Sequence, residues 1–157
     1  MTDRSDSRPS PESFVGSPIR TVSLHVEPGK IVEFANALHD TNAAYQRPAA
    51  GEPMLAPLTF SVVSALQNPG VGSAATEAVA ALGLDAPKVL NGGQEWEYLT
   101  PVYAGDVLCG VTTVEKVERR ANRRGQSMLL VELATIWRRD EEQVMRETVT
   151  IIEVDGQ

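Results

Sequence analysis

The sequence GQEWEYLTPVYAGD, at residues 93–106, decides the fold of this chain. Its first half alternates the aromatic residues Trp96 and Tyr98 with glutamates, and a period of two is typical of a β-strand with one buried face. Its second half contains a proline and ends in Ala-Gly-Asp, a combination that favours a turn. The stretch therefore predicts a strand over residues 89–99 that ends in a turn before the next element begins.

Three further segments with strand character follow this stretch toward the C-terminus. Residues 107–118 are rich in β-branched side chains, and residues 127–137 and 143–154 alternate apolar with polar positions. The joints between them are typical of turns. Strands joined in series form hairpins, so we predict an antiparallel meander of four strands. Cys109 is predicted to be a small buried side chain within it.

The first half of the chain is predicted to supply a cover for this sheet. A short strand over residues 21–26 precedes a helix that begins at Pro28, and two shorter helices are predicted over residues 58–67 and 74–82. The first helix is the only long amphipathic one, with its apolar stripe at Ile31, Phe34, Ala35 and Leu38. We therefore predict an α+β fold in which this one long central helix is wrapped by a curved antiparallel sheet of about five strands.

The composition fits a single globular domain. The chain has 157 residues, of which 42% are hydrophobic and 22% charged, and a chain of this length can bury a core of its own. Residues 1–13 are polar and predicted to form a disordered tail, which leaves residues 14–157 as the domain. The net charge of −7 argues against binding to nucleic acids or to membrane surfaces. The N-terminus has no secretory signal, so a cytoplasmic location is expected.

Cysteine and histidine are scarce in this chain. The single cysteine excludes an intrachain disulfide and a thiolate cluster. The two histidines, His25 and His39, exclude a His-rich site and leave few candidates for acid–base chemistry. No metal or other cofactor is expected.

Three segments resemble motifs of the MaoC-like dehydratase family, most closely its fatty-acid-synthase-like N-terminal branch. FANALHDTNAAY at residues 34–45 is similar to F-A-x-A-x-G-D-x-N-P-x-[HY], and LAPLTF at 55–60 is similar to A-P-P-T-F. The opening stretch at 93–106 is similar to G-x-Q-x-[FW]-x-[FY]-x-x-P-[VI]-x-A-G-D. The motifs occur in the family's order across residues 14–154. The resemblance implies the hot-dog fold.

The resemblance also implies a reaction class. Catalytic members of the family remove water from (R)-3-hydroxyacyl thioesters, or add it to trans-2-enoyl thioesters, carried on coenzyme A or acyl carrier protein. They use an Asp and a His within D-x-N-P-x-H and a backbone N–H that holds the thioester oxygen. The donor is needed because enolate-like charge develops on that oxygen, and the His is suited to proton transfer near neutral pH.

This chain departs from the family pattern at two positions. Asp40 matches the family Asp and is the one catalytic candidate, but Tyr45 stands at the His position, and a phenol has a pKa of about 10. Ala56-Pro57 stands where catalytic members have His-Gly, and proline has no N–H to offer. The residues that would then contact substrate by resemblance are Asn42, Tyr45, Pro57, Thr59 and Phe60.

The same two departures occur in accessory subunits of heterodimeric dehydratases, such as those of the mycolic-acid pathway. We therefore predict an accessory, non-catalytic subunit of an (R)-3-hydroxyacyl-thioester dehydratase, which shapes the acyl channel for a partner that carries the Asp–His pair. An isolated hot-dog protomer leaves a sheet edge uncovered, so a homodimer or a heterodimer is expected.

Other functions stay open. A self-sufficient hydratase would use Asp40 with Tyr45 or His39, and a non-enzymatic hot-dog dimer would only bind acyl thioesters. A thioesterase fits less well, because the acidic helix of hot-dog thioesterases is missing. The arginines at 119–124 are either a solvated turn or a contact for a coenzyme A phosphate, a phosphopantetheine or an acidic carrier protein.

Overall fold

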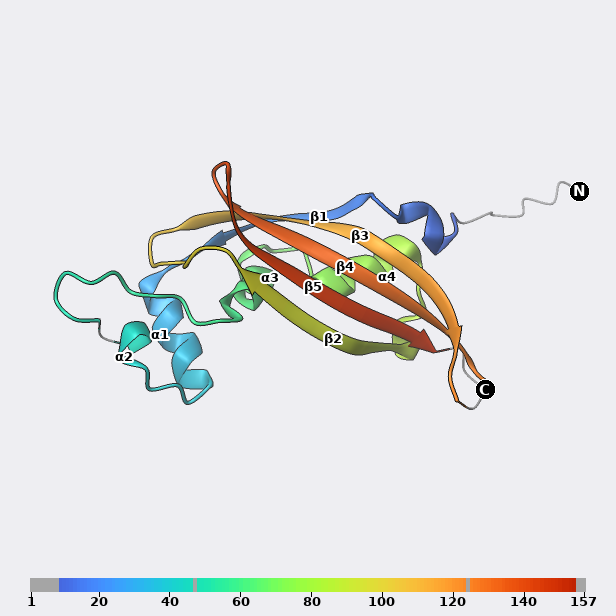
Figure 1. The fold of residues 1–157 in the computed structure, drawn as a ribbon, viewed down its shortest axis with the longest axis horizontal. Helices are drawn as coiled ribbons and strands as arrows, with labels where there is room; N and C mark the ends of the chain where they lie inside the picture. Colours follow the sequence, from blue (N-terminus) through green and yellow to red (C-terminus); the bar gives the residue numbers. More distant parts are fainter. Residues whose placement is uncertain (1–8, 47, 124, 155–157) are drawn as a thin grey trace, which may run out of the picture.

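The computed structural model describes residues 9–46, 48–123 and 125–154 of the chain. They form an antiparallel sheet of five strands in the order β1-β3-β4-β5-β2, with helices behind one face and at one end (Figure 1). The predicted α+β class and the antiparallel sheet of about five strands are confirmed. The strands are β1 Pro18–His25, β2 Val89–Tyr98, β3 Val107–Ala121, β4 Ser127–Arg139 and β5 Glu142–Val154.

The predicted meander is correct for β3, β4 and β5 and wrong for β2. Strand β2 pairs with β5 at one edge of the sheet, whereas β1 pairs with β3 at the other. The connection after β2 does not form a hairpin because it pairs elsewhere: Ala56 N–H donates to Val102 O at 2.8 Å, and Leu55 forms a bridge with Tyr103. This connection therefore carries the chain across the end of the sheet to β3.

The helices are short. They are α1 Pro28–Ala37, α2 Ala43–Gln46, α3 Ser64–Gln67 and α4 Ala74–Leu82, with 3₁₀ helices η1 Pro11–Phe14, η2 Phe60–Val63 and η3 Ala86–Lys88. None of the described helices is long and apolar enough to cross a membrane.

The cover of the sheet comes from α4 and from the consecutive η2 and α3, rather than from α1 (Figure 1). Helix α4 turns Ala74, Ala78 and Leu82 toward the sheet and buries them with Leu133 and Ile151. The prediction that the 31–38 helix covers the sheet is therefore wrong. That helix, α1, lies at the end of the sheet.

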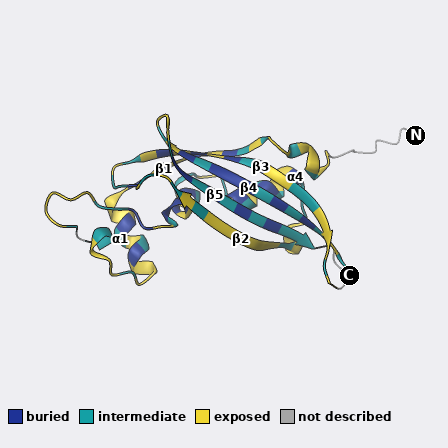
Figure 2. Cartoon of the chain, in the orientation of Figure 1, coloured by how far each residue is buried: buried dark blue, intermediate teal, exposed yellow. Residues whose placement is uncertain are grey.

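The core has two parts, and Trp137 fills the one nearer α1. Its side chain is 0% exposed and lies against Gly110, where an added Cβ would come within 2.7 Å of the indole ring. Buried positions alternate along β4 and β5 (Figure 2). Cys109 is exposed, in contrast to the prediction, because its neighbours Leu108 and Gly110 take the inward positions of β3.

The ordered chain begins before residue 14. Residues 1–8 of the predicted tail lie outside the described residues, but Pro11–Phe14 forms η1. Glu12 of this helix pairs with Arg119 on β3 at 3.1 Å.

Helix α1 ends in a left-handed residue. His39 has φ of +56°, and Asp40 N–H donates to Ala35 O at 2.9 Å while His39 N–H donates to Asn36 O at 3.0 Å. These two bonds form a Schellman motif, whose left-handed position favours glycine. The geometry explains why the similar family motif has Gly at this point.

Replacing His39 with glycine is expected to raise the free energy of unfolding by about 0.5–1 kcal/mol, because glycine adopts a positive φ without steric cost but loses more backbone entropy on folding. Urea denaturation followed by circular dichroism measures the change. The matched control is His25→Gly in β1, where the same substitution should destabilise. A loss of stability in both variants would contradict the prediction.

Candidate functional site

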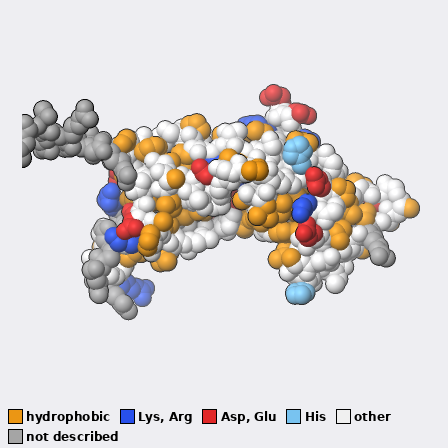
Figure 3. Space-filling model, turned by 180° about the vertical axis from the view of Figure 1, so that it is seen from behind, with side chains coloured by type: hydrophobic (Ala, Val, Ile, Leu, Met, Phe, Trp, Pro, Cys, Tyr) orange, Lys and Arg blue, Asp and Glu red, His pale blue; other side chains and the backbone are white. Residues whose placement is uncertain are grey.

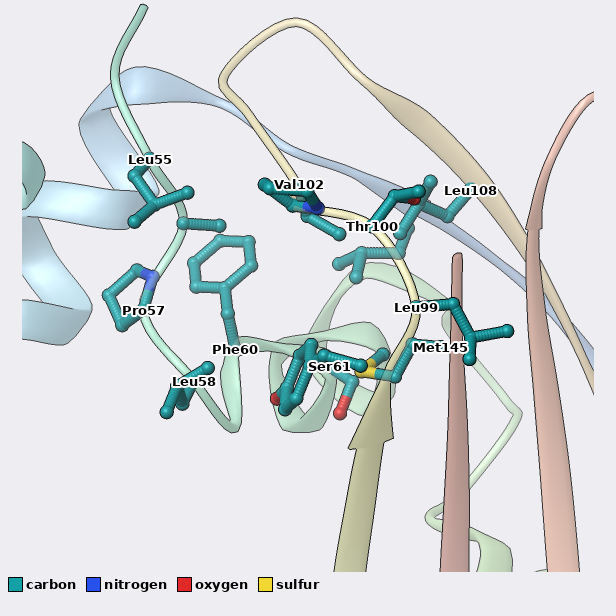
Figure 4. A pocket seen from close by; sticks show the side chains of 14 residues that line it. Leu55, Pro57, Leu58, Phe60, Ser61, Leu99, Thr100, Val102, Leu108 and Met145 are labelled. Atoms are coloured by element: carbon teal, nitrogen blue, oxygen red, sulfur yellow. The ribbon is translucent and has the colours of Figure 1, made fainter. Parts of the chain in front are cut away.

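An apolar cavity of about 340 Å³ lies between the segment before η2 and the segment after β2 (Figure 4). Leu55, Pro57 and Leu58 form one wall, and Leu99 and Val102 face them. The other lining side chains come from these two segments and from β1, β2, β3, β5 and η2. Among the described residues that line it, none is charged. The full set is Leu24, Leu55, Ala56, Pro57, Leu58, Phe60, Ser61, Tyr98, Leu99, Thr100, Pro101, Val102, Leu108 and Met145.

Backbone hydrogen bonds fix the walls of the cavity. Leu55 N–H donates to Ala44 O at 3.1 Å, which ties the segment before η2 to helix α2. Phe34 of α1 and Phe60 of η2 meet edge to face, with ring centroids 5.6 Å apart. The site is therefore built from segments that are far apart in the sequence.

A backbone donor stands at the start of η2, two residues after Pro57. Thr59 has φ of +71°, and its N–H donates to the Tyr98 hydroxyl at 2.9 Å. Burial of the Tyr98 side chain raises the pKa of its phenol above the ordinary value, so the phenol stays protonated at neutral pH. Its own O–H remains able to donate, and Tyr98 lines the cavity.

The two family-matched polar residues of the 34–45 motif act locally. The Asp40 carboxylate accepts from Asn42 N–H at 2.9 Å, and the Asn42 side chain accepts from Ala44 N–H at 3.0 Å at the start of α2. Asp40 follows the end of α1 and Asn42 precedes the start of α2, and both make the local side-chain to backbone bonds that are common at helix ends. Neither Asp40 nor Asn42 is among the residues that line the cavity.

The remaining predicted site residues lie at the cavity or beside it. Pro57 and Phe60 line it, and Thr59 presents its N–H to Tyr98. Tyr45 is half-buried, packs against the same core cluster and lies near enough to Tyr98 to affect the pKa of Tyr98 electrostatically. The structure thus brings Tyr45, Thr59 and Tyr98 together. Tyr98 was absent from the predicted site, although it occupies the [FY] position of the third motif.

Two of the arginines at 119–124 form ion pairs within the chain. Arg119 pairs with Glu12, and Arg120 binds Glu118 through Nε at 2.7 Å and through Nη2 at 2.9 Å. Arg120 and Lys116 together lower the pKa of the Glu118 carboxyl to about 2. Arg124 lies outside the described residues. In the part of the chain that the structure describes, no three of His, Cys, Asp and Glu are grouped as metal ligands would be.

Comparison with known proteins identifies the family. The model of the "FAS1-like, dehydratase domain region" matches residues 13–147. The "UPF0336 protein" of Thermobifida fusca (strain YX) is 31% identical over 132 residues, which cover 81% of this chain and 82% of that protein. The "UPF0336 protein" of Streptomyces avermitilis is 36% identical over 116 residues, which cover 70% of this chain and 75% of that protein.

Solved structures with this fold include chains from two protein complexes. A chain of the ChsH1-ChsH2 complex from Mycobacterium tuberculosis superposes with a TM-score of 0.72 at 17% identity, covering 94% of this chain and 89% of that one. A chain of the C-terminally truncated HadBC (3R-hydroxyacyl-ACP dehydratase) complex from the same organism superposes with a TM-score of 0.62 at 20% identity. The match covers 85% of this chain and 94% of that one. The likeness confirms the hot-dog fold. With the family model matching most of its length, the chain belongs to the FAS1-like dehydratase domains, which share the hot-dog fold of the MaoC-like dehydratases.

Proposed function

We propose that this chain is the accessory subunit of an (R)-3-hydroxyacyl-thioester dehydratase in cytoplasmic acyl-chain metabolism, and that a partner supplies the Asp–His pair. The observation that carries the proposal is the composition of the cavity. Its described lining residues can hold an acyl chain, and none of them is an Asp, Glu, Lys or His that could transfer a proton near neutral pH. Tyr45, at the family His position, is a phenol.

The cavity nevertheless suits an acyl thioester. The apolar side chains of Leu24, Leu108 and Met145 are among those that line it. The Thr59 N–H, now bonded to the Tyr98 hydroxyl, is a fixed donor of the kind that binds a carbonyl oxygen. A subunit with these parts can bind the chain and position the thioester without moving a proton itself.

The surface beside the cavity suits a partner chain. Leu58, Val62 and Leu66 recur every four residues from the segment before η2 into α3 and are 62%, 42% and 84% exposed. Apolar patches interrupt the polar surface on this helix-bearing side of the molecule (Figure 3). Strand β2 pairs with β5 along one side only, so its other side is an open sheet edge. Both features favour docking of a second hot-dog chain.

The decisive experiment is reconstitution. The purified chain alone is expected to hydrate crotonyl-CoA at less than about 1% of the rate of its complex with a hot-dog chain that bears D-x-N-P-x-H, because a positioned acid–base pair contributes about 10²–10⁴-fold. Stopped-flow loss of enoyl absorbance measures both rates. Full activity of the isolated chain that is abolished by Asp40→Asn would support the self-sufficient hydratase instead.

A variant at the mouth of the cavity tests whether this chain shapes the channel. In the active complex, Leu99→Trp should lower kcat/KM for a long enoyl thioester about tenfold and leave crotonyl-CoA nearly unaffected. Val15→Trp is the matched control, since Val15 is 49% exposed and Leu99 52%, and Val15 is not among the residues that line the cavity. Equal effects on both chain lengths would show that the channel lies elsewhere.

A further inference from the structure

A second cleft, of about 170 Å³, lies between the sheet and the helices that cover it. Its walls come from β1, β2 and β5 on one side and from η2, α3 and the start of α4 on the other. In contrast to the apolar cavity, it contains two charged side chains, Arg20 of β1 and Glu147 of β5, each only 7% exposed. Buried charges are costly unless they are paired or bound to a ligand.

The two charges do not form an ion pair with one another among the described contacts. Arg20 Nε donates to Gly72 O at 2.9 Å, and its Nη2 donates to Ser64 Oγ at 3.1 Å. Its Nη1 has no hydrogen-bond partner among the described residues. Burial lowers the pKa of the Arg20 guanidinium, and the negative charges of Glu147 and Glu77 offset part of that lowering. The guanidinium therefore retains donors on the cleft side.

Glu147 is held as a fixed acceptor on the same sheet side of the cleft as Arg20. Its Oε2 accepts from Trp137 Nε1 at 3.1 Å, and its Oε1 accepts from the Gln94 side-chain amide. Each carboxylate oxygen has a further lone pair. The sheet wall of the cleft thus presents one cationic donor and one anionic acceptor, with a net formal charge of zero.

A site with one cationic donor and one anionic acceptor favours a neutral group that both accepts and donates hydrogen bonds. A carboxamide accepts at its oxygen and donates at its nitrogen. Glu147 would repel a carboxylate ligand, and Arg20 would repel an ammonium ligand. The volume has room for on the order of five waters or non-hydrogen atoms, enough for one amide and its flanking carbons. Ser61 lines both the cleft and the apolar cavity, so the two lie next to each other.

We propose that the cleft between Arg20 and Glu147 binds a carboxamide of the pantetheine arm that coenzyme A and acyl carrier protein share, with the guanidinium at the amide oxygen and the carboxylate at the amide N–H. The identity of the ligand rests on the proposed function, because a pantetheine arm accompanies an acyl thioester. The cleft binds the polar arm, and the apolar cavity binds the acyl chain.

The two tryptophans of the chain allow a direct test, since both indole N–H groups bond to cleft residues: Trp137 to Glu147 and Trp96 to Ser61. In ¹H–¹⁵N spectra of the full chain, pantetheine should shift the Trp137 indole signal. S-ethyl thiobutanoate, an acyl thioester without an amide, should leave that signal in place and shift the methyl signal of Met145 in the apolar cavity. A Trp137 signal that stays fixed at tens of millimolar pantetheine would overturn the proposal and leave only water in the cleft.

A matched pair of variants locates the binding. Ala75 lines the cleft at the start of α4, so Ala75→Leu should raise the pantetheine concentration needed for half the shift about tenfold, whereas Ala81→Leu, an exposed position of the same helix, should not. Equal effects in both variants would overturn the assignment. If the thioester moves Met145 but pantetheine leaves Trp137 unchanged, the carboxamide site fails and the acyl site stands. If pantetheine moves Trp137 and the thioester leaves Met145 unchanged, the acyl site fails instead.

Discussion

Replacing Glu147 with leucine is expected to lower the free energy of unfolding by about 3–5 kcal/mol, the usual loss when one member of a buried set of charges is removed. The variant leaves Arg20 charged and buried without the electrostatic support of the carboxylate. It also leaves the Trp137 indole N–H, fully buried, without its acceptor. An unpaired buried donor is costly by itself.

Urea denaturation of the wild type and the variant measures this loss. Glu95→Leu on β2 is the matched control, since Glu95 is exposed, and its effect should stay within about 0.5 kcal/mol. The double variant Arg20→Leu/Glu147→Leu should lose less than the sum of the two single variants, because no lone charge remains. Strict additivity would show that the two charges do not support each other.

Gly110→Ala is expected to lower the free energy of unfolding by about 1–3 kcal/mol, because a methyl group there overpacks a closed part of the core. The added Cβ would lie 2.7 Å from the Trp137 ring, and the ring cannot give way because Trp137 is 0% exposed. The indole is also held by its hydrogen bond to Glu147.

Gly93→Ala on β2 provides the comparison for this variant. An added Cβ at Gly93 meets nothing within 4 Å, so the change should be neutral or slightly stabilising. Thermal denaturation of both variants separates steric overlap from the loss of a glycine in a strand. If Gly110→Ala melts at the wild-type temperature, Trp137 can move and the core near α1 is looser than its burial indicates.

The strands were predictable because large alternating side chains mark them clearly. Helix α4 was also predicted at its observed bounds, Ala74–Leu82. Its role as the cover of the sheet was not predicted, because the side chains that it buries against the sheet are mainly alanines. Alanines permit close packing, but they give a weak hydrophobic period in the sequence. Helix α1 has the clearer period, yet Leu38 of its stripe is 55% exposed.

The candidate site could be predicted only where one motif contains it. Pro57, Thr59 and Phe60 belong to one short segment, and all three lie at the cavity. The hydrogen bond between Thr59 and Tyr98 depends on where β2 ends relative to η2, which no local pattern encodes. Arg20 and Glu147 likewise line one cleft only in the folded chain, since 126 positions of sequence lie between them and strands β3 and β4 separate β1 from β5 in the sheet.

The open edge of β2 affects how the chain behaves before it meets a partner. Glu95 and Glu97 are exposed on this strand, and antiparallel pairing of two copies would place the glutamates of both on the same face of the joined sheet. Like charges at such a seam oppose self-association, as does the irregular register between Asn91 and Gly93. These features disfavour edge-to-edge pairing of two copies through β2, whereas a partner strand with basic residues at the facing positions would not meet the same repulsion.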